Sequence, residues 1–559
     1  NGAKASTTAV QKVSNLTEIM QVAGSKNGNF GAAVKEDGTV WTWGANTKGQ
    51  LGNGTTDSPK LNAIQVGSSG SNAMRITHGS VTNQDTGIQR VEFNNELITN
   101  VLIAENEEFH IFEDGISLNQ SFSLLPDSQE VKAGSVEYTS FNPNIATVGK
   151  YTGIVTPVKG IYGTAIIIAK SDGYSSIIRV SIKPQDTDDV KSVAKPMVAT
   201  GASHTIALKY DGTVWTWGNN TNGQLGNNST ENSSSPVQVK SADGNGYLTN
   251  IIEISAGSGH NMALRNDGTV WTWGSNTYGQ LGNGSSVNSM LPVQVKSADG
   301  NSFLADIVQI SAGYVHSMAL KKDGTVLAWG RNDGGQLGNN NTSNKSLPVQ
   351  VKGGASGSEY LTDVVQVTAG NWHSMALKAN GTVYAWGWGQ YGQLGNGYTT
   401  NRDDTDYYSY EKIYSAPVQV LNGAQTSETG YLKEVVQIDA MGGTGRGEKN
   451  RFGTSLAVTE SKEVYGWGNS MYGALGVNAS IVSTPVRVAT GISTAVQVAG
   501  GSKSGSDDYH VNSIGNTGYT YILKEDGTVS SLGYNVHGEL GNGAKASTTA
   551  VQKVSNLTE

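Results

Sequence analysis

Four histidines occupy equivalent positions along the chain, each seven residues before a turn that begins with Asp or Asn. Imidazoles at a repeated position could form a ring that binds a metal ion or a substrate. However, the same position holds Phe30, Thr454 and Tyr519 elsewhere in the chain. We therefore expect these histidines to be hydrogen-bonded, structural members of a repeat. They are His204, His260, His316 and His373.

A second set of candidate residues lies in three segments that lengthen otherwise regular loops. These segments are 397–416, 441–453 and 500–518, and the first carries five Tyr. Tyr presents a large, rigid contact surface with a polar tip, which is typical of protein-binding sites. The alternative is neutral drift, because surface loops tolerate insertions well. The predicted protein-binding residues are Arg402, Asp403, Asp404, Asp406, Tyr407, Tyr408, Tyr410, Tyr414, Arg446, Arg451, Asp507, Asp508 and Tyr509.

Other chemistry has little support in the residue pattern. Asp403, Asp404 and Asp406 could hold Ca²⁺ through oxygen ligands, but they lack the spacing of an EF-hand. The chain has no Cys, no Ser nucleophile motif, no HExxH and no phosphate loop. The recurrent Asp-Gly pairs are explained by tight turns, because Gly tolerates positive φ. We therefore expect a non-enzymatic protein with no cofactor and no metal.

Charge and hydropathy exclude two further classes of partner. The net charge is −8 and there is no basic run, so a nucleic-acid partner is not expected. The sequence contains no apolar stretch near the roughly 20 residues that span a bilayer. We therefore expect no membrane insertion in this segment, and a protein partner or self-association instead.

The candidate residues must be positioned by a repeat. The segment DGTVWTWGNNTNGQLG at 211–226 recurs in six other versions, some of them degenerate. In the third unit, apolar stretches at 251–257, 261–265, 269–274 and 291–295 read as four short β-strands around an Asp-Gly turn. Four antiparallel strands repeated seven times predict an all-β fold, a seven-bladed β-propeller. The closing glycines of the seven units fall at 52, 226, 282, 338, 395, 476 and 541.

Nearly every unit carries a Trp-Gly pair whose Trp should bury against the neighbouring blade. Trp271 and Trp273 stand two apart and so share one face of their strand. The seventh unit has Leu532 where Trp is expected. The predicted structural tryptophans are Trp43, Trp217, Trp273, Trp329, Trp386 and Trp467.

These motifs resemble the regulator-of-chromosome-condensation repeat propellers. The signature SAG-x-x-H-S-M-A-L-K-x-D-G-T-V-x-x-W-G-x-N-x-x-G-Q-L-G stands nearly whole at 311–338 and 368–395, and the resemblance covers roughly 1–67 and 195–541. The resemblance implies a propeller that is usually seven-bladed. The family's eukaryotic role, nucleotide exchange on a small GTPase at chromatin, fits poorly with the acidic charge and the absence of a basic tail.

A long interruption separates the first unit from the second. Residues 98–184 lack the repeat motifs, and VEYTSFNPNIATVGKYTGIVTPVKGIYGTAIIIAKS at 136–171 resembles the bacterial immunoglobulin-like fold of group 2. That resemblance implies an inserted β-sandwich, with 68–97 as a connector and 185–194 as a linker. Such modules serve as spacers in exported bacterial proteins, so we expect an extracellular or cell-surface protein of a bacterium.

Topology places these features on two faces. In a four-stranded antiparallel meander, the first-to-second and third-to-fourth loops emerge on the same face. The three long loops of units 5, 6 and 7 should therefore cluster on one rim. The inserted domain follows a fourth strand and should leave from the opposite face.

The two ends of the chain are identical. Residues 1–18 recur unchanged as 542–559, although seven units are complete by residue 541. Three interpretations stay open: one period of an array of near-identical propellers, an engineered duplication, or one strand represented at both ends of a repeating assembly. Residues 7–12 match the outer strand of other units, so the two copies are expected to close the last blade or to link to a neighbour.

Together these features predict a non-enzymatic structural or adhesive repeat protein outside the cell. It is expected to act by protein–protein contacts, as one period of a tandem array, filament or homopolymer. The alternative is a soluble propeller that binds and inhibits a secreted protein or enzyme, as the resemblance to bacterial propellers of this kind also implies.

Overall fold

The computed structural model describes residues 11–12, 19–25, 28–35, 39–66, 89–90, 100–104, 107–110, 136–158, 163–171, 174–183, 194, 196–354, 359–399, 413–425, 430–444, 451–488, 492–503, 517–541 and 547. Regular structure in these residues is β-strand, apart from a three-residue 3₁₀ turn at Met471–Gly473. The all-β prediction is confirmed. The same residues contain no helix with the length and hydropathy needed to cross a bilayer.

Seven four-stranded antiparallel sheets of the described chain follow the repeat units and are numbered here in chain order. Sheet 1 is β2 (Ile19–Gly24), β3 (Phe30–Lys35), β4 (Val40–Gly44) and β5 (Lys60–Gln65); sheet 2 is β14 (Met197–Thr200), β15 (His204–Leu208), β16 (Val214–Gly218) and β17 (Ser233–Gln238); sheet 3 is β18 (Ile251–Ala256), β19 (His260–Arg265), β20 (Val270–Gly274) and β21 (Ser289–Gln294); sheet 4 is β22 (Ile307–Ala312), β23 (His316–Lys321), β24 (Val326–Gly330) and β25 (Lys345–Gln350).

Sheets 5 to 7 come from the C-terminal half. Sheet 5 is β26 (Val364–Ala369), β27 (His373–Lys378), β28 (Val383–Trp388) and β29 (Ile413–Gln419); sheet 6 is β30 (Val435–Thr444), β31 (Arg451–Thr459), β32 (Val464–Asn469) and β33 (Ile481–Arg487); sheet 7 is β34 (Ala495–Lys503), β35 (Thr517–Lys524), β36 (Val529–Gly533) and β1 (Gln11–Lys12).

A tight turn between the second and third strands sets the register, and it is Asp-Gly in sheets 2, 3, 4 and 7, Asn-Gly in sheet 5 and Ser-Lys in sheet 6. In sheet 3, the Asp267 carboxylate accepts the backbone N–H of Thr269 at 3.0 Å and its hydroxyl at 2.6 Å. Gly268 has φ of +80°, a conformation that side chains disfavour. This tight turn joins β19 to β20 so that Leu264 faces Val270 across the pair.

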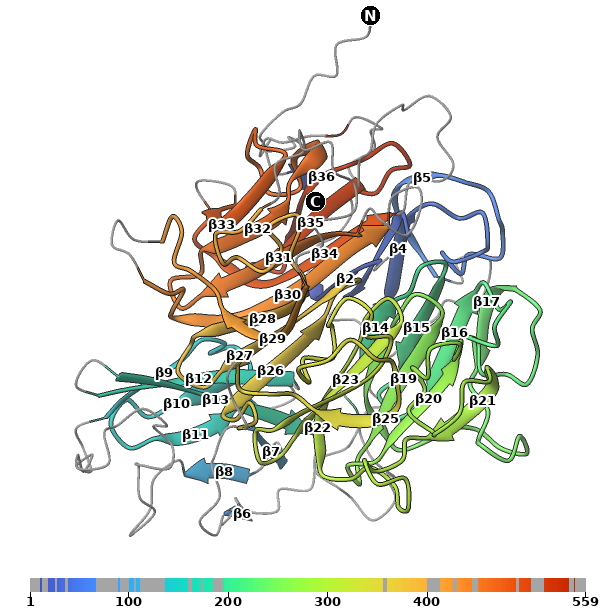
Figure 1. Ribbon diagram of the computed structural model, residues 1–559, viewed down its shortest axis with the longest axis horizontal. Coiled ribbons are helices and arrows are strands. Elements are labelled where there is room, and N and C mark those ends of the chain that lie inside the picture. Colours follow the sequence, from blue (N-terminus) through green and yellow to red (C-terminus); the bar gives the residue numbers. More distant parts are fainter. Residues whose placement is uncertain are drawn as a thin grey trace, which may run out of the picture.

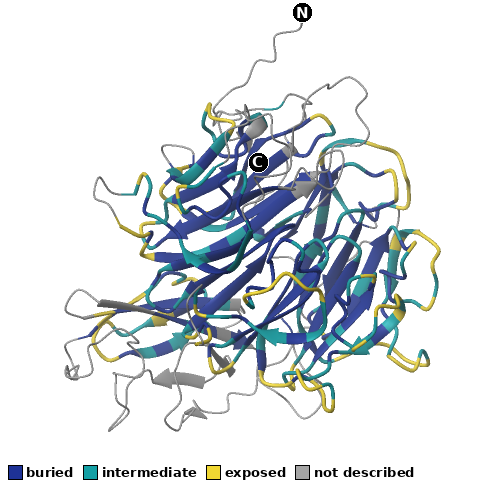
Figure 2. Ribbon diagram, in the orientation of Figure 1, coloured by how far each residue is buried: buried dark blue, intermediate teal, exposed yellow. Residues whose placement is uncertain are grey.

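The first strand of each sheet contacts the first strand of the next, and β34 of sheet 7 contacts β2 of sheet 1. We call each boundary between consecutive sheets a seam. Apolar side chains from both sheets fill it: at seam 2/3, Ile206 and Leu208 pack in one cluster with Ile254 and Trp273. Figure 2 shows the result, with the buried residues along the strands and the exposed ones in the turns.

Sheet 7 draws its strands from both ends of the chain. Strand β1 pairs antiparallel with β36, with Gln11 opposite Ser531 and Lys12 opposite Ser530. The first copy of the duplicated segment therefore supplies the fourth strand of the last sheet.

Two further sheets lie between β5 and β14 in the sequence. One contains β7 (Asn100–Ala104), β13 (Tyr174–Lys183), β12 (Gly163–Ser171) and β9 (Glu137–Ser140); the other contains β10 (Ala146–Val148), β11 (Ile154–Pro157), β8 (Glu107–His110) and β6 (Gln89–Arg90). The β7–β13 and β6–β8 pairs are parallel, and the other pairs are antiparallel.

The sheet with β12 and β13 rests on sheets 5 and 6 (Figure 1). The backbone N–H of Ile177 donates to the carbonyl oxygen of Ala379 at 2.7 Å, and Phe141 joins the apolar cluster of sheets 5 and 6. Lys170 forms an ion pair with Glu460, a residue next to the second-to-third turn of sheet 6. The contact face is thus the one that carries the second-to-third turns.

Candidate functional site

The polar side chains of the repeat meet at the seams. At seam 3/4, the His260 ring Nε2 lies 3.0 Å from the Ser317 hydroxyl oxygen of the next sheet. The Ser317 hydroxyl donates to the backbone carbonyl of Gln280, back in sheet 3, at 2.9 Å. Because that hydroxyl proton is committed, the imidazole is the donor to Ser317. The indole N–H of Trp329 donates to the same Gln280 carbonyl at 2.9 Å.

We call this set of three hydrogen bonds a relay: the His ring bonds to a polar side chain, and that side chain and a Trp indole both donate to one backbone carbonyl. The same relay recurs at the neighbouring seams. A His ring lies 2.9 Å from its polar partner at seams 2/3, 4/5 and 5/6. The partner donates to a Gln carbonyl of the preceding sheet at 2.7 to 2.9 Å, and a Trp indole donates there at 3.0 to 3.1 Å. The partners and acceptors are Asn261 and Gln224, Ser374 and Gln336, and Ser455 and Gln393, with Trp273, Trp386 and Trp467 as the indoles.

Seam 1/2 keeps part of this relay. Trp217 donates to the Gln50 carbonyl at 2.9 Å and Thr205 donates to it at 2.8 Å. Phe30, at the His position of sheet 1, cannot form the third bond. The other predicted structural tryptophan, Trp43, belongs to seam 7/1.

A glycine explains the spacing of the SAG-x-x-H motif. A Cβ atom on Gly257 would collide with the His260 ring and with the carbonyl oxygen of Gly313 in the next sheet. Glycine at this place therefore lets the imidazole and the neighbouring backbone approach together.

The four histidines are buried and lie at four different seams. Burial lowers the pKa of His204 to about 4, against a smaller opposing effect of its hydrogen bond to Asn261. That imidazole is therefore neutral near pH 7. Within the described ranges, His, Asp and Glu side chains form no group of three that could hold a metal ion.

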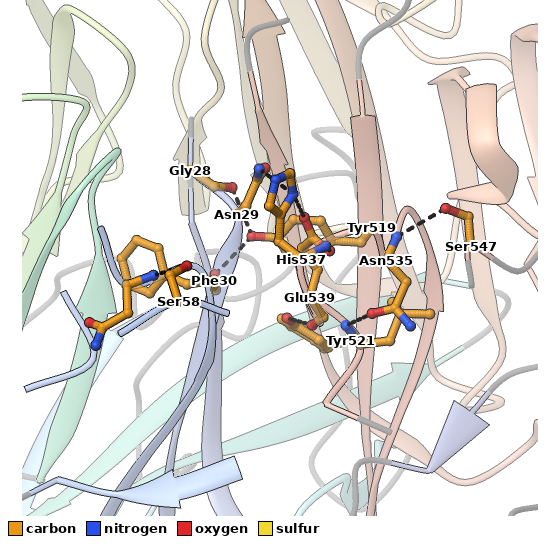
Figure 3. Close-up of polar contacts among 12 residues, drawn as sticks. Gly28, Asn29, Phe30, Ser58, Tyr519, Tyr521, Asn535, His537, Glu539 and Ser547 are labelled. Atoms are coloured by element: carbon orange, nitrogen blue, oxygen red, sulfur yellow. Dashed lines mark hydrogen bonds and ion pairs between the residues drawn. The ribbon is translucent and has the colours of Figure 1, made fainter. Parts of the chain in front are cut away.

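Seam 7/1 uses different residues for these bonds, and Figure 3 shows its two tyrosines, Tyr519 with Phe30 and Tyr521 with Glu539. The acceptor is the backbone carbonyl of Glu539, which takes the indole N–H of Trp43 at 2.8 Å. The second donor is the hydroxyl of Tyr521. Tyr519, at the His position of sheet 7, donates its hydroxyl to the carbonyl of Phe30 in sheet 1 at 2.8 Å.

Seam 7/1 also buries a carboxyl group. Five other units have Gln at the position of Glu539, and there the amide oxygen accepts one backbone N–H, as Gln280 does from Tyr278 at 2.9 Å. Glu539 accepts the equivalent N–H of His537 at 2.8 Å, and its other oxygen lies 3.2 Å from the His537 ring. Burial raises the pKa of Glu539, and His537 partly offsets the rise. The ring also contacts the Asn29 amide at 3.1 Å.

Most of the predicted protein-binding residues lie outside the described residues. These are Arg402, Asp403, Asp404, Asp406, Tyr407, Tyr408, Tyr410, Arg446, Asp507, Asp508 and Tyr509. Two are described in part: Tyr414 lies in β29 opposite Gly387 and packs against the core cluster, and Arg451 begins β31 opposite Thr444. The predicted rim therefore stays a prediction.

Sequence reasoning missed a row of exposed aromatics. Each belongs to a connector between sheets, is bridged to the segment after a fourth strand, and is about half exposed. The signal was present, because an aromatic-Leu pair recurs after each PVQV motif of these units. The residues are Tyr247, Phe303, Tyr360 and Tyr431.

One connector borders a cavity of about 360 Å³. It is lined by Tyr247, Leu248 and Thr249, by the turn residues Ser241, Ala242, Asp243 and Gly246, and by Arg265 and Trp271 of sheet 3. Trp273 is fully buried in seam 2/3, whereas Trp271, two residues earlier, is half-buried and reaches this cavity.

The repeated four-stranded sheets and the bonds that join them define a repeat β-propeller. The family model described as the RCC1-like domain matches residues 173–559, more than half of the chain, and the model of the Regulator of chromosome condensation (RCC1) repeat matches residues 37–78. The chain belongs to the RCC1-like domain family.

Curated relatives cover parts of the chain. The ultraviolet-B receptor UVR8 of Arabidopsis thaliana is 28% identical over 317 residues, which are 52% of this chain and 69% of the receptor. The E3 ubiquitin-protein ligase HERC2 of Mus musculus is 32% identical over 39% of this chain but only 4% of the ligase. Protein pim1 of Schizosaccharomyces pombe is 33% identical over 38% of this chain and 42% of its own length. The chain thus spans less than half of two of these three relatives.

Solved structures of similar proteins include yeast RCC1 (Prp20) bound to Kap60, with 21% identity, a TM-score of 0.47 and coverage of 65% of this chain and 75% of that one. Prp20p from Saccharomyces cerevisiae has 17% identity, a TM-score of 0.48 and coverage of 92% and 82%.

Proposed function

We propose that the chain is a non-enzymatic protein-binding scaffold, a seven-bladed propeller with an inserted Ig-like domain at a bacterial cell surface. The observation that carries the proposal is the use of the repeat's polar side chains. His, Ser and Trp of the described seams are engaged between sheets, as His260, Ser317 and Trp329 are at seam 3/4. Such a frame is rigid, and recognition falls to the loops that it carries.

Two features support the architecture. The first strands contact one another in sequence from sheet 1 to sheet 7 and back to sheet 1, as in a closed ring. The two sheets of residues 89–183 largely overlap residues 98–184, where the Ig-like domain is expected, although β6 (Gln89–Arg90) falls in the predicted connector. Their contact with Ala379 and Glu460 on the second-to-third turn face supports the proposal that the long loops of units 5 to 7 point the other way.

A test of protein binding compares two loop replacements in the full chain. Residues 400–412 are replaced by a short Gly-Ser linker, and the matched control replaces 355–358 in the connector after sheet 4. Purified proteins are cross-linked to intact bacterial cells and to secreted proteins. Loss of the cross-linked partner with the first replacement alone is expected. Equal capture by both variants would remove the Tyr-rich loop as the binding site. Inhibition of a secreted enzyme by the free chain would favour the soluble-inhibitor alternative.

The location has a separate test. Brief proteolysis of intact cells should release peptides from this chain, while a cytosolic protein stays uncut. Peptides that appear only after cell lysis would contradict the cell-surface part of the proposal.

We also propose that the duplicated segments link successive propellers. In sheet 1, Asn46 N–H donates to the Ser58 hydroxyl twelve residues later, at 2.9 Å, and Asn535 makes the same bond to Ser547 at 3.1 Å. Ser547 is the described residue of the second copy, and it has the place that Ser58 has before the outer strand of sheet 1, while residues 11–12 of the first copy pair with β36. These two contacts support the proposal that both copies can serve the outer-strand position of one sheet.

Light scattering tests the linkage. The chain is expected to form dimers or longer species in a concentration-dependent manner, whereas a chain that lacks residues 1–18 should close its own last sheet and stay monomeric. A full chain that remains monomeric at all concentrations would contradict the proposal.

A further inference from the structure

The cavity beside Tyr247 has the composition of a ligand site. Tyr247 is 55% exposed and offers an aromatic surface, and Trp271 forms a second aromatic wall. Ser241, Asp243 and Thr249 are polar residues of the lining, and the Asp243 carboxylate already accepts hydrogen bonds from Ser241 and Asn245. Its volume of about 360 Å³ lies at the lower end of the range for small-molecule sites.

Two hydrogen-bond donors of this site lack acceptors. Among the residues that the structure describes, neither the Trp271 indole N–H nor the Arg265 Nε–H has a hydrogen-bond partner, although both atoms are buried. The equivalent indoles are satisfied: Trp215 donates to the Thr213 hydroxyl at 3.2 Å and Trp41 donates to Thr39 at 2.8 Å. An unsatisfied buried donor is costly, so an oxygen atom of a ligand is the partner that this site needs.

The mixture of groups selects the class of ligand. Hydroxyl groups both donate and accept, so they can accept from the two donors and also donate to the Asp243 carboxylate, which has acceptor capacity beyond its bonds to Ser241 and Asn245. A carboxylate would satisfy the donors but would face Asp243, and the Arg265 guanidinium already lies 4.0 Å from the carboxylate of Asp267. An apolar ligand would leave the donors unpaired. The apolar face of a sugar ring, by contrast, can lie on an aromatic ring.

We propose that this cavity binds a neutral sugar unit of a glycan. The site lies on the face of the second-to-third turns, because Ile251 at the end of the connector bonds to Gly212 of such a turn. It is therefore distinct from the long loops of units 5 to 7 and independent of the protein partner proposed for them.

The next unit provides a matched control. Phe303 occupies the position of Tyr247 and is equally exposed at 55%, but Leu327 stands where sheet 3 has Trp271. Leu327 carries no donor and is buried, so this unit has the exposed aromatic without the rest of the site. Sugar binding should therefore depend on Tyr247 and not on Phe303.

The test uses the full chain against immobilised neutral oligosaccharides, with acidic oligosaccharides and random peptides on the same surface. Binding to at least one neutral oligosaccharide is expected, with a dissociation constant that rises tenfold or more in Tyr247→Ala and stays within twofold in Phe303→Ala. Trp271→Phe keeps the aromatic wall but removes the donor, and should weaken binding severalfold. The unfolding midpoints of all three variants check that the fold is retained.

Several results would overturn the proposal. They are failure to bind any neutral oligosaccharide, stronger binding to acidic oligosaccharides or peptides, and equal loss in Tyr247→Ala and Phe303→Ala.

Discussion

Seam 3/4 and seam 7/1 each place an indole N–H and a hydroxyl on one backbone carbonyl, but the hydroxyls come from opposite sides. At seam 3/4, Ser317 and Trp329 both belong to sheet 4 and reach back to Gln280. At seam 7/1, Trp43 comes from sheet 1, whereas Tyr521 belongs to sheet 7, the sheet of the acceptor itself.

The reason is a single glycine. Gly31 stands in sheet 1 where Ser317 stands in sheet 4, and a Cβ atom there would collide with the Tyr521 hydroxyl. The larger Tyr thus fills the space and the hydrogen-bonding role that the missing side chain leaves. At both seams the backbone carbonyl is hydrogen-bonded to an indole and a hydroxyl. The residue that provides the hydroxyl can belong to either of the two sheets.

The largest expected effect comes from removing a seam tryptophan, and it tests whether the two seams contribute equally to stability. Trp329→Ala and Trp43→Ala each remove a fully buried indole and its bond to a carbonyl. Each should lower the free energy of unfolding by about 3–5 kcal/mol, the usual cost of truncating a buried Trp. Urea denaturation of both variants measures this. If Trp43→Ala lowers the free energy of unfolding much less than Trp329→Ala, seam 7/1 opens before the other seams.

Lowering the pH should destabilise seam 2/3 more than seam 7/1, because a histidine is present at seam 2/3 and a tyrosine takes its place at seam 7/1. The folded pKa of His204 is lowered from 6.5 to about 4 by burial. A base with a depressed pKa contributes stability that is present above pH 6.5 and is lost as the pH falls towards 4. Across this interval the contribution should fall by about 2–3 kcal/mol.

His204→Gln provides the check on that prediction. Gln keeps a donor near Asn261 but does not titrate, so the variant should lose less stability than the parent between pH 6.5 and pH 4. Parallel pH profiles for parent and variant would mean that other groups govern acid unfolding.

The sequence motifs predict that the units are equivalent, but they do not predict the residues that replace the relay at seam 7/1. The recurrence of His, Trp and Gln-Leu-Gly predicts equivalent strands, because each motif has its own place in a four-stranded unit. In the sequence, Tyr519 only marks a position where other units have His. Its hydrogen bond could not be predicted, because the acceptor, the Phe30 carbonyl, lies 489 residues away in the chain. The burial of Glu539 likewise follows from the meeting of the first and last sheets, which no local pattern encodes.

Trp271 and Tyr247 show a second limit. Period-two alternation correctly puts Trp271 and Trp273 on one face, but it does not tell which is at the buried end of the strand. Trp273 lies in the seam and Trp271 lines the cavity, because the connector that follows sheet 2 brings Tyr247 beside it. The aromatic-Leu signal in the connectors recurs in sequence, yet only the fold shows that it is exposed.

The buried carboxyl of seam 7/1 gives a smaller effect with a defined sign. Burial raises the folded pKa of Glu539 above 4.5, so its contribution to stability is present below pH 4.5 and is lost as the pH rises through the folded value. Glu539→Gln restores the residue of the other units. It should raise the free energy of unfolding at neutral pH by about 1–2 kcal/mol, with the gain vanishing near pH 4.

Gln280→Glu is the reciprocal change at seam 3/4. Tyr278 stands there in place of His537, so the new carboxylate would lack the imidazole that lies 3.2 Å from Glu539. This variant should lose stability at neutral pH. If both substitutions are neutral, the two seams do not differ in how they tolerate charge.

The smallest effect concerns the hydroxyl that replaces the histidine. Tyr519→Phe removes the bond to the Phe30 carbonyl, but that carbonyl still accepts the backbone N–H of Ser25 at 3.2 Å. The loss should therefore be about 1 kcal/mol, the net value of one hydrogen bond. His260→Phe at seam 3/4 imitates the same loss and also leaves the Ser317 hydroxyl bonded to Gln280. The imidazole is a buried polar group, and its replacement also changes the shape of the space that it fills. Urea denaturation measures the loss of unfolding free energy in both variants. Equal losses at His260 and Tyr519 would indicate that both side chains act through their hydrogen bonds alone.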